Sequence, residues 1–175
     1  MYMISAYFDK EASKEIERLI QKVYKATGNT FMIEHKVPPH LTLAAIQARE
    51  EKSLISAFYE ITSDLSSKPI DIVSVGMFLP YVVYITPVLN QYLLDISYQI
   101  SEQIKQISDA SISKCYQTMN WLPHITIGKT LTSSQMKKAL EVMMNNFVPF
   151  KAEVCKIGLA KVNPYEDIET VCLYP

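Results

Sequence analysis

The sequence predicts an α+β fold with two similar lobes, each with a mostly antiparallel sheet and two flanking helices, around a central cleft. Three observations support this prediction. Apolar residues recur at strand spacing in some segments and at helical spacing in others. The order of these segments in the first half of the chain returns in the second half. A six-residue phrase, PHLTLA at 39–44, also returns as PHITIG at 123–128.

The sequence of the first half of the chain predicts three strands and two helices. Residues 3–8 favour a strand, and the charged segment after them carries apolar residues at helical spacing as far as Gly28, a residue type that commonly ends helices. Pro38 and Pro39 keep the chain extended before the next strand. The remaining expected elements are a strand at 40–46, a helix within 49–65 and a strand at 70–78.

The second half repeats this order with different residues. Its expected elements are a strand at 81–86, a helix at about 88–107, a strand at 124–130, a helix through Asn145 and strands at 150–162 and 169–173. Ser133 can cap the second of these helices. We therefore expect residues 1–175 to form a single domain built of two pseudo-symmetric lobes, with approximate sequence repeats at 1–80 and 81–175.

The composition is that of an ordinary soluble globular domain. The 175 residues are 49% hydrophobic and 20% charged, which provides enough apolar material for a core. The net charge of -1 argues against a broad surface for a nucleic-acid duplex, which is normally basic. The N-terminal residues lack the basic start and apolar core of a signal peptide, and no apolar run reaches the roughly 20 residues that span a bilayer. We therefore expect a cytoplasmic protein that binds neither a membrane nor duplex DNA.

The three cysteines predict neither disulfides nor a metal site. Cys115, Cys155 and Cys172 are odd in number and widely spaced, without a Cys-x-x-Cys pair. We expect them to be buried free thiols in a reducing compartment. Of the three histidines, only His35 lies outside the repeated phrase, beside Lys36 in a polar loop, and we expect it to be solvated.

The repeated phrase places one imidazole and one hydroxyl on the same side of a strand. Side chains in a strand alternate between its two faces, so His40 and Thr42 point to one side while the leucines next to them point to the other. His124 and Thr126 have the same relation to the neighbouring isoleucines. If the two lobes are related by a two-fold axis, both polar faces meet in one cleft.

Two histidines that face one site suit a reaction with two proton transfers. An imidazole with a pKa near 6.5 can take a proton from an attacking hydroxyl or water, while a second, protonated imidazole gives one to the leaving oxygen of a phosphate. The threonine hydroxyls would hold the non-bridging phosphate oxygens, where charge is concentrated in the transition state. This arrangement requires no metal, and His40 and His124 lack the partner spacing of a zinc site. The pattern leaves open which histidine is the base.

With this pair of His-x-Thr strands in a duplicated chain, the sequence resembles the two-histidine (2H) phosphoesterase superfamily. This superfamily includes the LigT-like bacterial 2′-5′ RNA ligase proteins and cyclic nucleotide phosphodiesterases. The resemblance covers nearly the whole chain and implies a LigT-like bilobal fold. It further implies that His40 and His124 are the catalytic histidines, and that Thr42 and Thr126 bind the phosphate.

The resemblance also suggests further substrate-binding residues. Lys129 stands where the family often has an arginine, but in a regular strand it faces away from His124, so its contact with substrate requires a bend that Gly128 could provide. Trp121 and Tyr84 are expected to stack on a base, because aromatic faces do so without reading sequence. Three other aromatic residues lie near the expected cleft edges, namely Tyr7, Phe78 and Tyr81.

The function that the resemblance implies is that of a metal-independent phosphoesterase without cofactors. It would cleave, or reversibly form, 2′,3′-cyclic phosphate or 2′-5′ phosphodiester bonds in RNA ends or small nucleotides, and we expect it to act as a monomer. Two alternatives stay open. The same cleft could bind RNA ends or nucleotides without turnover, or the histidines could only satisfy hydrogen bonds in a structural duplication. The sequence does not decide between hydrolysis and ligation.

Overall fold

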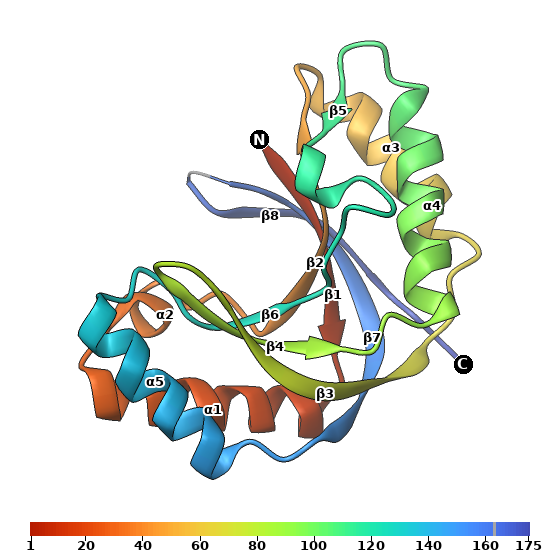
Figure 1. Ribbon diagram of the computed structural model, residues 1–175. Coiled ribbons are helices and arrows are strands. Elements are labelled where there is room, and N and C mark those ends of the chain that lie inside the picture. The colour runs from red at the N-terminus through yellow and green to blue at the C-terminus, as the bar shows by residue number, and fades with distance from the viewer. Residues whose placement is uncertain (163) are drawn as a thin grey trace.

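The computed structural model describes residues 1–162 and 164–175 (Figure 1). Its helices are α1 (Lys10–Thr27), α2 (Phe31–Glu34), α3 (Glu51–Thr62), α4 (Gln91–Lys105) and α5 (Ser133–Asn146), with a short 3-10 helix η1 (Lys114–Tyr116). Its strands are β1 (Tyr2–Phe8), β2 (His40–Gln47), β3 (Lys68–Phe78), β4 (Val82–Pro87), β5 (Ser111–Ile112), β6 (Ile125–Gly128), β7 (Phe150–Lys161) and β8 (Glu166–Cys172). The expected α+β class is confirmed.

All of these strands belong to one open antiparallel sheet. The strand order is β5-β2-β1-β7-β3-β4-β6, with β8 paired to β7 on a branch. The two sheets expected from the sequence are therefore continuous. The long strands β3 and β7 join them, because Lys68–Ile72 pair with Phe150–Val154. This pairing connects segments about half the chain apart, which local periodicity does not reveal.

The helices form two pairs, and each pair takes one helix from each half of the chain. Helix α1 packs against α5, and α3 packs against α4 (Figure 1). Helices of the expected repeat 1–80 therefore pack against helices of the expected repeat 81–175. Their apolar stripes meet the sheet, where the largest fully buried side chains include Ile16 and Leu19 of α1 and Leu54 of α3.

Local capping explains where the helices begin and end. Asp9 accepts hydrogen bonds from two main-chain N–H groups at the start of α1, and Gly28 ends that helix in the left-handed conformation, with φ 69, as expected. Helix α5 is capped by Thr132 and not by Ser133 as predicted. The Thr132 side chain and Gln135 exchange hydrogen bonds with each other's main chain, so the capping box fixes the boundary one residue earlier.

Several features differ from the sequence prediction. Three short elements, α2, β5 and η1, were expected as loops, because two to four residues are too few to show a period. The cysteines are free, but they are not buried: Cys115 and Cys172 are exposed and Cys155 is partly exposed. Cys115 lies in η1 and Cys172 at the end of the branch strand β8, where few elements cover them. Among the described residues, no helix is both long and apolar enough to cross a membrane.

Candidate active site

The two copies of the repeated phrase lie against each other through strands β2 and β6. Their apolar residues are buried in the core as the alternation predicts, each with 1% or less of its surface exposed: Leu41, Leu43, Ile125 and Ile127. The alternating residues occupy the other side of the strands. We call this side, with His40, Thr42, His124 and Thr126, the histidine face.

Each imidazole is held by the main chain two residues before it. Nδ1 of His40 lies 2.8 Å from the carbonyl oxygen of Pro38, and Nδ1 of His124 lies 2.9 Å from that of Leu122. A carbonyl oxygen only accepts hydrogen bonds, so in both residues Nδ1–H must be the donor. In the neutral imidazole, Nε2 then carries the free lone pair and can accept a proton.

The pKa values of both histidines are lowered from the ordinary value. Burial lowers the pKa of His40 most, its bond to the Pro38 carbonyl raises it, and the charges of His124 and Lys129 lower it further. Burial also lowers the pKa of His124, partly offset by the Leu122 carbonyl and reinforced by Lys129. The charge of Lys129 thus lowers both pKa values, and that of His124 also lowers the pKa of His40.

Neighbouring strands and side chains fix the threonines and the second phrase. Thr42 is buried and pairs with Ser5 of β1, while Thr126 is half-buried and pairs with Tyr84 of β4. The hydroxyl of Thr86 donates to the carbonyl of Pro123 at 2.7 Å, directly before His124. The backbone that carries each functional side chain is thus hydrogen-bonded on the adjacent strand.

Lys129 lies just beyond the end of strand β6, where the backbone leaves the regular strand alternation. Strand β6 ends at Gly128, and Thr130 has a positive φ of 56, so the chain bends around Lys129. Its charge lowers the pKa of both motif histidines, and its ammonium lies 5.5 Å from the centre of the Phe31 ring. Phe31 belongs to α2, which the sequence did not predict.

Aromatic rings surround the motif histidines. The Phe78 ring meets His124 edge-on, with centroids 4.8 Å apart, and Tyr84 lies 5.4 Å from the same imidazole. Tyr7 lies 6.3 Å from His40. Phe78 is 38% exposed, whereas Tyr84 is only 7% exposed, so Phe78 offers more ring surface to a ligand. The sequence marks Phe78 only as one of several aromatic residues near the expected cleft edges.

Trp121 occupies a different position from the one expected. Its ring is 7% exposed, and its indole N–H donates to the main-chain carbonyl of Thr42 at 3.2 Å. This bond joins the segment before His124 to the strand that carries His40. The position favours a role in holding the two phrases together over stacking on a base.

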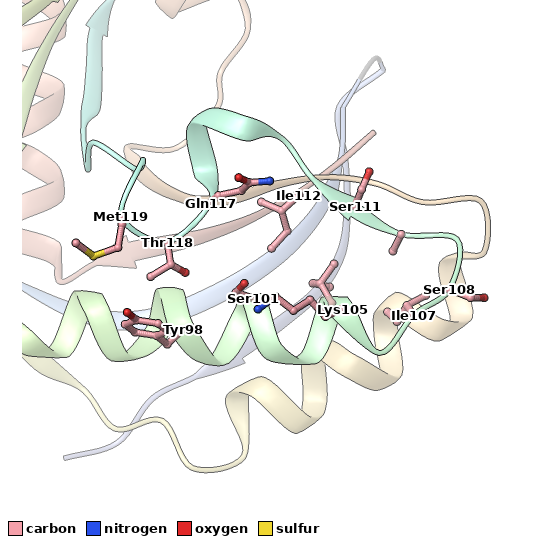
Figure 2. A pocket seen from close by; sticks show the side chains of 12 residues that line it. Tyr98, Ser101, Lys105, Ile107, Ser108, Ser111, Ile112, Gln117, Thr118 and Met119 are labelled. Carbon is pink, nitrogen blue, oxygen red and sulfur yellow. The ribbon is translucent and has the colours of Figure 1, made fainter.

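Two other features lie outside this site. His35 is exposed, stacks on Phe31 and uses Nδ1 to bond the Phe31 carbonyl, so it does not join the motif pair. A cavity of about 680 Å³ opens between α4 and the segment 107–119, and its lining includes no residue of the repeated phrase (Figure 2). Within the described part of the chain, no three His, Cys, Asp or Glu side chains gather as a metal site would require.

Comparisons with known proteins bear on the family and the fold of the chain. The sequence profile of the 2′-5′ RNA ligase superfamily matches residues 8–165. The fold is similar to that of E. coli LigT complexed with 3′-AMP, at 14% identity and TM-score 0.61, over 99% of this chain and 98% of that one. It is also similar to TT0787 of Thermus thermophilus, at 15% identity and TM-score 0.63, over 98% and 97% of the two chains. Usb1 of Kluyveromyces marxianus matches at 10% identity and TM-score 0.51, over 98% and 97%. No curated protein sequence matches the chain.

Proposed function

The chain belongs to the 2′-5′ RNA ligase superfamily, and we propose that it is a metal-independent phosphoesterase. It cleaves, or reversibly forms, 2′,3′-cyclic phosphate or 2′-5′ phosphodiester bonds in RNA ends or small nucleotides. The observation that carries this proposal is the duplicated histidine geometry. In both phrases Nδ1–H is bonded to a carbonyl two residues earlier, which leaves two Nε2 atoms for proton transfer.

We propose different roles for the two imidazoles. Both imidazoles are half-buried, and the charge of His124 lowers the pKa of His40 in addition to burial. We therefore take His40 as the neutral imidazole and His124 as the protonated one. His40 is the general base and His124 the general acid in the direction of hydrolysis.

Hydrolysis of a cyclic phosphate then proceeds by two proton transfers. Nε2 of His40 takes a proton from water as the water oxygen bonds to phosphorus. Nε2–H of His124 gives its proton to the leaving 2′ or 3′ oxygen as that oxygen–phosphorus bond breaks. The reverse reaction exchanges these roles, and a ribose hydroxyl in place of water gives the exchange or formation of a diester.

The hydroxyls and one cation stabilise the charge on phosphorus. Thr42 and Thr126 lie on the same face as the histidines and donate to the non-bridging oxygens, which carry the charge in the transition state. Lys129 supplies positive charge near both imidazoles.

Two aromatic residues support the site: Trp121 fixes the strand that carries Thr42, and Tyr84 packs against His124. The nucleotide class is supported by LigT, whose structure was obtained with 3′-AMP.

Turnover of a substrate panel tests this function. The panel comprises nucleoside 2′,3′-cyclic phosphates, 2′-5′-linked dinucleotides and 3′-5′-linked dinucleotides, assayed with and without chelator. We expect turnover of a cyclic or 2′-5′-linked substrate that chelator leaves unchanged. His40→Ala and His124→Ala should each lose about 100-fold to 10,000-fold in rate, as expected for loss of a general acid or base. His35→Ala is the control and should retain full activity.

Two results would overturn the proposal. Tight nucleotide binding without turnover of any panel member would show a binding module instead of an enzyme. Activity that survives in the double variant of His40 and His124, or that chelator abolishes, would exclude the two-histidine mechanism.

A further inference from the structure

A row of paired residues crosses the sheet from His40. Tyr7 of β1 pairs with His40 on one side and with Lys156 of β7 on the other. Residues that pair directly in antiparallel strands point to the same face of the sheet. Neighbouring strands lie about 4.8 Å apart, so the backbone of Lys156 is about 10 Å from that of His40 on the histidine face.

Tyr7, the middle member of this row, is fixed in place. Its ring lies over Gly158, where an added Cβ would come within 2.8 Å of the ring, so glycine leaves the room it needs. The Tyr165 hydroxyl donates to the Asp167 carboxylate at 2.6 Å. Because that proton is used, the Tyr7 hydroxyl must donate to Tyr165, at 3.3 Å. This chain anchors the far end of the Tyr7 ring.

Lys156 places its charge on this fixed ring. Its ammonium lies 4.9 Å from the centre of the Tyr7 ring, a cation–π arrangement. Lys156 is half-buried, and among the described residues no carboxylate comes within ion-pair distance of it. A positioned cation therefore stands on the histidine face without an ion-pair partner among the described residues.

We propose that Lys156 forms a second anion subsite, which binds a phosphate of the substrate other than the one that reacts. This inference rests on the proposed function and narrows its substrate class. The substrate is a nucleotide with a further phosphate beside the reacting one, such as an RNA end or a nucleoside with a 5′-phosphate. A nucleoside cyclic phosphate with no other charge leaves the subsite empty and is the poorer ligand.

Binding of two adenosine phosphates tests the subsite independently of turnover. Isothermal titration calorimetry at fixed ionic strength compares adenosine 3′,5′-bisphosphate with adenosine 3′-monophosphate. We expect the native protein to bind the bisphosphate about tenfold more tightly, the effect of one hydrogen bond to a charged group. Lys156→Gln should remove this preference, and Lys156→Arg should largely retain it. Lys151→Gln removes an exposed lysine from the same strand and should leave the preference intact.

Kinetics separate a failure of this inference from a failure of the proposed function. With adenosine 2′,3′-cyclic phosphate carrying a 5′-phosphate, Lys156→Gln should raise KM about tenfold with little change in kcat, because a remote binding contact is lost. Without the 5′-phosphate it should change neither constant. If the native enzyme turns over both substrates but Lys156→Gln keeps the full preference, the subsite is wrong and the phosphoesterase stands. If binding shows a preference that depends on Lys156 but no substrate is turned over, the subsite is supported and the proposed phosphoesterase function is wrong.

Discussion

At the scale of single residues, the proline in each copy of the repeated phrase helps to orient the imidazole of the histidine that follows it. Each motif histidine follows a proline and bonds the carbonyl of the residue before that proline. Proline fixes φ and keeps its predecessor extended, so the turn that brings this carbonyl to Nδ1 is largely set before folding. The two imidazoles thus have the same tautomer, and we attribute the difference between their proposed roles to charge.

The assignment of His124 as general acid predicts a selective rescue. A 4-nitrophenyl phosphodiester has a leaving group that departs without protonation, so loss of the acid matters less for it. We expect His124→Ala to lose at least about tenfold less activity on this substrate than on a 2′-5′-linked dinucleotide. His40→Ala should lose similar activity on both. Rescue of His40→Ala in place of His124→Ala would reverse the assignment.

The residue types of the site were predictable from the sequence, but their detailed placement was not. Recurrence of His-x-Thr singles out His40 and His124, and strand alternation places the threonines on the same side. The position of Lys129, whose charge lowers the pKa of both histidines, depends on where β6 ends, which a short apolar pattern leaves undefined. No local sequence pattern indicates that Lys156 lies near His40, because the two residues are brought together only by the pairing of β1 with β2 and with β7.

At the scale of elements, the indole of Trp121 links the approach to β6 with β2. Its bond to the Thr42 carbonyl crosses between the two copies of the phrase, at 3.2 Å. No periodicity in the sequence signals this contact, since residues 79 positions apart meet only through the folded sheet. The alignment of the two histidines therefore depends on a residue that touches neither of them by a hydrogen bond.

Trp121→Phe should weaken both stability and turnover. It leaves the buried Thr42 carbonyl without this donor, which we expect to cost about 1–3 kcal/mol of unfolding free energy, measured by urea denaturation. It should also lower kcat, because the two phrases lose their link. Tyr92→Phe is the matched control, since it removes a hydroxyl on α4 that donates to the Ser66 carbonyl. That variant should lose stability but keep kcat, and an equal loss of kcat in both would argue against a specific role for Trp121.

At the scale of the whole molecule, the two similar halves of the sequence contribute their strands to one continuous sheet. Helical and strand periodicity was sufficient to locate the long elements, because an apolar stripe must face a core whatever the topology. The continuous sheet and the crossed helix pairs were not predictable in this way. They depend on the pairing of β3 with β7 and on the packing of α1 with α5, which are long-range contacts.

The half-buried histidines should make the whole fold sensitive to mild acid. The pKa values of His40 and His124 are lower in the folded protein, so the unfolded chain binds more protons as pH falls. Unfolding free energy should therefore decrease as pH drops through about 6.5, the ordinary histidine value. Urea denaturation between about pH 7.5 and 5 measures this slope. The double variant of both histidines to alanine should show a flatter slope, and an unchanged slope would contradict the lowered pKa values.

The central claim is that His40 and His124 act as one acid–base pair on a phosphodiester. The most direct test is the pH dependence of kcat/KM for a nucleoside 2′,3′-cyclic phosphate. Because burial and Lys129 lower both pKa values, we predict a bell-shaped profile centred below about pH 6.5. Lys129→Gln should move the bell to higher pH. A profile without two limbs, or a bell that does not move in Lys129→Gln, would contradict the account.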